Sequence, residues 1–109
     1  MSQEAIERRI RQLTESWRKG YSLPQAFYLS PEIYQRDLER MLLRHWICAG
    51  HESSIPAPGD YFLFDMDRES VIIMRGHDGM VRALMNVCRH RGSRICSRES
   101  GHASSGVIA

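Results

Sequence analysis

The sequence predicts an α+β fold in which helices precede a small antiparallel β domain. Apolar residues recur at helical spacing over residues 4–19 and again after Ser30. From about residue 46 the pattern changes to short β-branched and aromatic runs separated by turn residues. A chain of 109 residues has room for one small core. We therefore expect residues 1–45 to form a helical lead-in and residues 46–109 to form the β domain.

Two helices are expected in the lead-in. The first covers residues 4–19, and Gly20 is its expected stop. The second is expected to begin with Ser30 as N-cap and Pro31 at the first helical position, and to end near Trp46. Each has an apolar stripe that should pack against its surroundings. The stripes are Ile6, Ile10, Leu13 and Trp17 in the first helix and Tyr34, Leu38, Met41 and Leu42 in the second.

Four short runs are expected to be strands. Turn residues separate them, and Asp78-Gly79 is the best hairpin signal because glycine tolerates the positive φ of tight turns. Residues 97–105 are expected to form a weakly structured tail. The four expected strands are residues 46–50, 60–64, 70–74 and 81–85.

Charge and hydropathy exclude several classes of protein. The net charge of +2 is too small to indicate binding to nucleic acid or to an acidic membrane surface. The N-terminal residues lack the apolar segment of a secretory signal, and no apolar run approaches the roughly 20 residues that span a bilayer. Three cysteines form an odd set, which favours reduced thiols or metal ligands over a disulfide framework. We therefore expect a cytoplasmic protein.

Cys88-Arg89-His90-Arg91-Gly92-Ser93, after the last expected strand, is the segment with the most potential chemistry. A thiolate and an imidazole two residues apart on a loop can bind metal, although the pair alone is a weak signal. Cys96 and His102 would complete a four-ligand zinc set by count, but the spacing fits no usual zinc pattern. We expect Cys96 to be small and partly buried and His102 to lie in the tail.

The remaining cysteine and histidines have simple expected roles. Cys48 is expected to be a buried strand thiol, and His45, His51 and His77 are expected at the surface. The arginines at positions 89, 91 and 94 either form a solvated basic face or act on a bound cluster or on acidic groups of a neighbouring domain.

Residues 86–93, Asn-Val-Cys-Arg-His-Arg-Gly-Ser, resemble the first cluster-binding loop of Rieske non-haem iron oxygenases. These are the large (α) subunits of aromatic-ring-hydroxylating and N-demethylating enzymes. The resemblance covers roughly residues 21–101. Residues 23–28 are most similar to enzymes that demethylate quaternary ammonium compounds such as glycine betaine, stachydrine or carnitine. The other matching segments, in family order, are residues 32–44, 45–47, 50–51, 55–61 and 75–79.

The resemblance implies a Rieske β-sandwich domain with a [2Fe–2S] cluster, Cys88 on one iron and His90 on the other. The family's second pair, Cys-x-x-His, does not follow His90 in the sequence, so half of the ligand set is present, and residues 106–109 resemble the strand that leads to that pair. We expect the domain to be incomplete at its C-terminus and the isolated chain not to hold a cluster stably. The mononuclear Fe(II) is expected only in a C-terminal catalytic domain that these residues lack, which leaves open whether the chain itself is an enzyme.

The leading hypothesis is the N-terminal part of a Rieske oxygenase large subunit. Electrons would pass through the [2Fe–2S] cluster to a mononuclear iron for O2-dependent hydroxylation or N-demethylation of a small organic substrate. The implied partners are a flavin- or ferredoxin-type reductase and further copies of the chain in a homotrimer, with no nucleic acid and no membrane. The alternatives are a stand-alone Rieske ferredoxin-like electron carrier and a non-functional truncated remnant.

Overall fold

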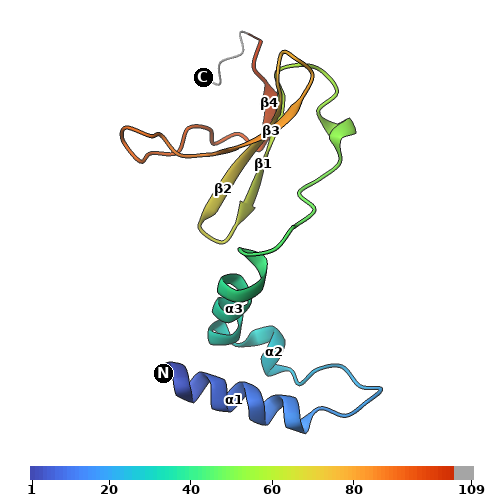
Figure 1. The fold of residues 1–109 in the computed structure, drawn as a ribbon, viewed down its shortest axis with the longest axis vertical. Coiled ribbons are helices and arrows are strands. Elements are labelled where there is room, and N and C mark those ends of the chain that lie inside the picture. The colour runs from blue at the N-terminus through green and yellow to red at the C-terminus, as the bar shows by residue number, and fades with distance from the viewer. Residues whose placement is uncertain (105–109) are drawn as a thin grey trace. The chain divides into compact units, whose positions relative to one another are not determined.

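The computed structural model describes residues 1–104, and it has helices in its first part and a sheet in its second (Figure 1). The chain divides into two compact units, Met1–Cys48 and Ala49–Ala109. The predicted α+β class, with helices before an antiparallel sheet, is confirmed. Within the described residues, no helix has the length and apolarity that a bilayer crossing requires.

Helix α1 covers Gln3–Ser16 and is shorter than expected. It begins at the N-cap Ser2, whose hydroxyl accepts a hydrogen bond from the Ala5 amide at 3.2 Å. Trp17 already has an extended backbone, and its indole N–H donates to the carbonyl of Tyr21 at 2.8 Å. The predicted end near residue 19 is therefore wrong, because this bond holds the chain in an extended exit. Gly20 has φ +88° in the turn that follows.

The second predicted helix begins where expected but ends early. Helix α3 covers Pro31–Asp37, and the Ser30 hydroxyl accepts a hydrogen bond from an amide in its first turn. It continues as the π-helix η1, Leu38–Leu42, whose wider turn is closed by the Leu43 amide donating to the Leu38 carbonyl at 2.9 Å. Helical bonding thus stops before the expected end near Trp46. A short helix α2, Ala26–Leu29, precedes α3 and was not predicted.

The buried side chains of this segment differ from the expected stripe. Leu38 is buried as expected, and Ile33, which was not assigned to the stripe, is buried with it. Tyr34 and Met41 are about half exposed. The π-helix explains part of the difference, because an extra residue per turn rotates the side chains that follow it.

The sheet has four strands in the order β3-β2-β1-β4, and all neighbouring pairs are antiparallel. Three of the four predicted strands are confirmed, each near its expected position. Residues 46–50 do not form a strand; both sides of β1 are occupied, by β2 and β4. The strands are β1, Asp60–Met66; β2, Glu69–Arg75; β3, Val81–Met85; and β4, Ser100–His102.

Strand β4 lies within the segment that was expected to be a weakly structured tail, so that expectation is wrong for its residues. Gly101 pairs with Tyr61 of β1. A Cβ atom at position 101 would lie 2.8 Å from the Tyr61 hydroxyl oxygen, so any larger residue there would require the Tyr61 ring to shift. The pairing thus depends on a tertiary contact that the local sequence pattern does not reveal.

Both hairpin turns adopt the backbone conformations that their sequences favour. Asp67 has φ +53° in the two-residue turn between β1 and β2, and Gly79 has φ +81° between β2 and β3. The Asp78-Gly79 turn is confirmed. The Arg75 guanidinium also donates to the Gly79 carbonyl at 2.7 Å, which ties the turn to the end of β2.

The core of the sheet unit includes a residue from the connection between β3 and β4. Tyr61, Ile72 and Cys96 are buried together, and Leu63 and Met74 pack against them. Cys96 therefore anchors one end of the loop that carries Cys88 and His90. The prediction for residues 106–109 concerns positions outside the described residues.

Candidate functional site

Cys88 and His90 lie on the connection between β3 and β4, in a tight loop that we call the ligand loop, residues 88–93. The Cys88 amide donates to the Ser93 carbonyl at 2.6 Å, and the Gly92 amide donates to the Cys88 carbonyl at 2.8 Å. Gly92 has φ +67°, a conformation in which glycine has no steric cost. These contacts fold the loop back on itself and place both predicted ligands on one turn.

The two side chains differ in exposure. Cys88 is half-buried and His90 is exposed. Among residues 1–104, no hydrogen bond or ion pair occupies the thiol or the imidazole, so both remain available as metal donors. A thiol and an imidazole are the donor types of a Rieske cluster.

The zinc set considered from the sequence is not assembled. The described residues contain no group of three or more His, Cys, Asp or Glu side chains that are placed to hold a metal ion. Cys96 is buried, and its Sγ forms a hydrogen bond with the Tyr61 hydroxyl at 3.4 Å. This hydrogen bond, together with burial, raises the pKa of Tyr61.

His102 is not a tail residue, contrary to the prediction. It belongs to β4, and its Nδ1 lies 2.7 Å from Asp60 Oδ1. The Ala57 amide, and then His102, lower the pKa of Asp60. His102 thus connects β4 to the start of β1.

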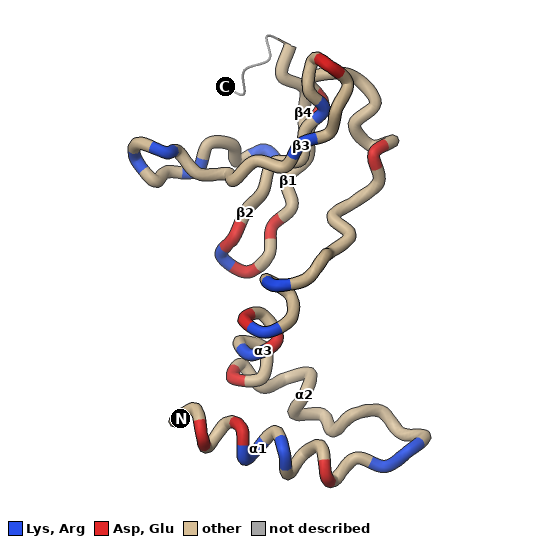
Figure 2. Tube along the Cα trace, in the orientation of Figure 1, with Lys and Arg blue, Asp and Glu red and all other residues tan. Residues whose placement is uncertain are grey.

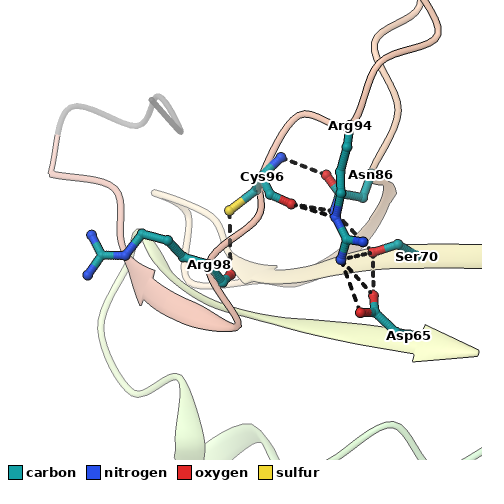
Figure 3. A network of polar contacts seen from close by, with 6 residues as sticks. All are labelled: Asp65, Ser70, Asn86, Arg94, Cys96 and Arg98. Atoms are coloured by element: carbon teal, nitrogen blue, oxygen red, sulfur yellow. Dashed lines mark hydrogen bonds and ion pairs between the residues drawn. The ribbon is translucent and has the colours of Figure 1, made fainter.

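Asn86 closes the base of the ligand loop (Figure 3). Its side-chain amide pairs with the backbone of Cys96 in both directions: Nδ2 donates to the Cys96 carbonyl at 2.7 Å, and Oδ1 accepts from the Cys96 amide at 2.8 Å. Nδ2 also donates to the Ser70 hydroxyl at 3.0 Å. Asn86 is only 5% exposed, so these bonds satisfy polar groups that water does not reach well.

Arg94 links the end of the loop to the sheet (Figure 3). Its Nε donates to the Cys96 carbonyl at 3.0 Å, and its Nη2 donates to Asp65 Oδ2 at 3.0 Å. The Ser70 hydroxyl, and then Arg94, lower the pKa of Asp65. Two strands, β1 through Asp65 and β2 through Ser70, therefore help to hold this connection.

The loop is basic at its surface. Figure 2 shows several Lys or Arg positions along the connection between β3 and β4. Arg89 and Arg91 are exposed and make no hydrogen bond or ion pair within the described part of the chain. Only Arg94, of the three loop arginines considered from the sequence, is held by the sheet.

The exposure of the remaining histidines agrees with the prediction, and that of Cys48 does not. His45, His51 and His77 are exposed, as predicted. Cys48 is exposed rather than buried, because residues 46–50 form no strand.

Asp65, Ser70 and Asn86 were not predicted from the sequence to be part of the site. Asn86 lies inside the motif that carries the resemblance, so the motif could have identified it as a residue of the site. Asp65 and Ser70 gave no signal, since they lie 29 and 24 residues from Arg94 and approach it only in the folded sheet.

A family model for the Rieske [2Fe-2S] domain matches residues 45–109. Among curated proteins, the chain is 39% identical over 82 residues to a glycine betaine monooxygenase oxygenase subunit of Pseudomonas aeruginosa. It is 41% identical over 90 residues to the large oxygenase component of a naphthalene 1,2-dioxygenase system of Pseudomonas putida. These alignments cover 75% and 83% of this chain but 19% and 20% of the relatives. The chain thus spans about a fifth of the length of the relatives it matches.

Solved structures show the same relationship. Naphthalene 1,2-dioxygenase from Rhodococcus sp. with bound indole superposes with a TM-score of 0.78 at 29% identity, over 98% of this chain and 24% of that chain. A quaternary ammonium Rieske monooxygenase, described for carnitine oxidation and inter-subunit electron transfer, gives a TM-score of 0.66 at 37% identity, over 74% of this chain and 22% of that chain.

Proposed function

Because this chain belongs to the Rieske [2Fe–2S] domain family, we propose that it is the cluster-bearing N-terminal part of an oxygenase large subunit. Residues 1–45 would be its helical lead-in, and residues 46–109 would be the first part of the Rieske domain. The relatives are oxygenase subunits and oxygenase components, which favours this function over a stand-alone ferredoxin-like carrier.

Cys88 and His90 would each bind one of the two irons. The observation that carries this proposal is the ligand loop itself, in which a thiol and an imidazole with no other polar partner within residues 1–104 share one tight turn. A bound [2Fe–2S] cluster supplies reversible one-electron transfer. The other thiolate and imidazole would come from a Cys-x-x-His pair after His90, which residues 91–109 do not contain.

The chain's own residues would present the two ligands and limit their movement. The Ser93 carbonyl holds the Cys88 amide, and Asn86 fixes the start of the loop against its end. The half-buried position of Cys88 keeps part of the thiol away from water, whereas the exposed His90 leaves its imidazole open to solvent protons. A neutral imidazole ligand that can exchange a proton is suited to coupling protonation with reduction.

The activity of the complete protein would be O2-dependent hydroxylation or N-demethylation of a small organic substrate at a mononuclear iron. Electrons would be supplied by a flavin- or ferredoxin-type reductase, and the subunits would form a trimer. Similarity to a glycine betaine monooxygenase subunit supports a quaternary ammonium substrate, and similarity to a naphthalene dioxygenase component supports an aromatic one.

The reading frame after the Ala109 codon provides a direct test. We expect it to encode a Cys-x-x-His pair within a few residues and a long segment beyond. An immediate stop codon would contradict the proposal and would favour the truncated remnant.

Cluster binding provides the biochemical test. In the complete subunit, we expect Cys88→Ser to abolish the visible absorption of a [2Fe–2S] centre and to lower the iron content. Cys48→Ser is the matched control, since Cys48 is exposed and outside the ligand loop, and it should retain both. Wild-type iron and absorption in Cys88→Ser would contradict the assignment. Stoichiometric [2Fe–2S] bands in the 109-residue chain alone would favour the ferredoxin-like carrier.

A further inference from the structure

We propose that Arg94 is a positioning residue for the ligand loop, which it holds against the hairpin of β1 and β2. Within the described residues, Arg94 makes no hydrogen bond to Cys88 or His90, and it would act through the backbone between them and itself. Its effect on a bound cluster rests on the proposed function, whereas its effect on the loop does not.

The sheet side of this contact is a cross-strand polar pair. Asp65 of β1 stands opposite Ser70 of β2 in the strand register, and the Ser70 hydroxyl donates to Asp65 Oδ1. The two-residue turn after β1 lies close by and limits the movement of both residues. Arg94 Nη2 donates to Asp65 Oδ1 at 3.2 Å, to Asp65 Oδ2 at 3.0 Å and to the Ser70 hydroxyl at 3.3 Å. The guanidinium therefore binds the Asp65–Ser70 pair, which we call the platform and which is held together by its own hydrogen bond.

The loop side of the contact is the Cys96 carbonyl. This oxygen accepts from Arg94 Nε at 3.0 Å and from Asn86 Nδ2 at 2.7 Å, so both ends of the connection meet at one acceptor. A carbonyl oxygen has two lone pairs, and both are used here. Cys96 is buried and its side chain belongs to the core of the sheet unit, so this end of the connection is held in the folded protein.

Arg94 is connected to Cys88 through the peptide bond to Ser93 and one hydrogen bond. Ser93 precedes Arg94 in the chain, and the Ser93 carbonyl accepts from the Cys88 amide at 2.6 Å. Release of Arg94 from the platform would let Ser93 move, and with it the backbone of Cys88. Reduction potentials of iron–sulfur centres respond to hydrogen bonds and solvent access around the ligands, so this movement has a measurable consequence.

Arg91 is the control that distinguishes a positioning role of Arg94 from a simple effect of positive charge. It carries the same charge on the same connection between β3 and β4, is exposed, and makes no hydrogen bond or ion pair within residues 1–104. Arg94 and Asp65 are each about half exposed, so loss of their ion pair should not unfold the protein.

The first experiment needs no cluster. In the 109-residue chain, alkylation by iodoacetamide is followed at each cysteine by peptide mass spectrometry, with exposed Cys48 as the internal reference. We expect Arg94→Gln to speed the labelling of Cys96 about fivefold, because losing the half-exposed hydrogen bonds of Arg94 favours local opening at this end of the connection. Asp65→Asn should act in the same direction, and the double variant should be less than additive. Equal Cys96 labelling in wild type, Arg94→Gln and Arg91→Gln would overturn the proposal.

The second experiment uses the cluster-bearing subunit and measures its reduction potential and the g values of its reduced EPR spectrum. We expect Arg94→Gln to shift the potential further than Arg91→Gln and to change the g values, which Arg91→Gln should leave unchanged. Arg94→Lys keeps the charge but lacks the planar fork of donors, so it should also change the g values. Equal potentials in the two Gln variants, or wild-type g values in both Arg94 variants, would overturn the proposal.

The two experiments separate the two claims. In one outcome, Arg94→Gln speeds Cys96 labelling but no subunit, wild type included, carries a cluster. That result would defeat the proposed function and support the positioning role. A cluster that is present and insensitive to Arg94 would defeat the positioning role alone.

Discussion

The base and the tip of the ligand loop are built in opposite ways. At the base, Asn86 and Cys96 are buried and their polar groups are paired with each other. At the tip, Arg89, His90 and Arg91 are exposed and have no polar partner among the described residues. The difference indicates that the sheet unit fixes where the loop begins and ends, and that the residues between are left available to bind. The predictions below test this division, from the largest expected effect on stability to the smallest.

Removal of Asn86 should cause the largest effect. Asn86→Ala deletes its three side-chain hydrogen bonds and leaves the buried Cys96 amide without its acceptor. We expect a loss of about 2–4 kcal/mol in the free energy of unfolding, measured by urea denaturation. The control is Arg89→Ala at the tip, which should change it by less than about 0.5 kcal/mol. Similar values for the two variants would mean that the base is not the stable part of the loop.

A substitution at Gly92 should have an intermediate effect, through the backbone alone. A Cβ atom there would meet no atom within 4 Å, but φ is +67°. We expect Gly92→Ala to lower the free energy of unfolding by about 1–2 kcal/mol, because a left-handed backbone is unfavourable for residues with a side chain. Gly92→Asn is the comparison, since asparagine tolerates this conformation and should cost less. Equal losses in Ala and Asn variants would show that the conformation of Gly92 is not the cause.

Low pH should weaken the contacts of the Asp65 carboxylate with Ser70 and Arg94. The pKa of Asp65 in the folded protein is lowered, by the Ser70 hydroxyl and then by Arg94. A lowered pKa contributes stability above the unfolded value, near pH 4, and this contribution is lost as the pH falls through the folded value. We therefore expect the stability of the wild type to fall more steeply below about pH 4 than that of Asp65→Asn, by thermal unfolding. Parallel profiles would exclude a contribution from Asp65.

The smallest effect on stability is expected at a proposed ligand. His90→Ala removes an exposed imidazole that has no polar partner within residues 1–104. We expect a change below about 0.5 kcal/mol in urea denaturation without iron. A loss as large as that of Asn86→Ala would show that the tip is also structural, which would contradict the division described above.

Local chemistry accounts for the features that were correct from the sequence. Ser30 and Pro31 start α3 because a hydroxyl acceptor and a preset φ suit a helix N-terminus wherever they occur. The strand runs around residues 60–64, 70–74 and 81–85 and the Asp78-Gly79 turn depend on neighbouring residues in the same way. The position of Cys88 and His90 on a loop after β3 was also correct.

Tertiary structure alone decided the surroundings of that loop. The sequence by itself determined the type of α1, α3 and the first three strands, and the presence of a thiol and an imidazole on one loop. It did not determine that Asn86 would meet Ser70, 16 residues away, or that Arg94 would meet Asp65, 29 residues away. Nor did it reveal that β4 would pair with β1, or that the Tyr61 ring would lie where a side chain at position 101 would be. The physical reason is that propensities and turn preferences act between neighbours, whereas these contacts exist only once the strand register has brought distant side chains together.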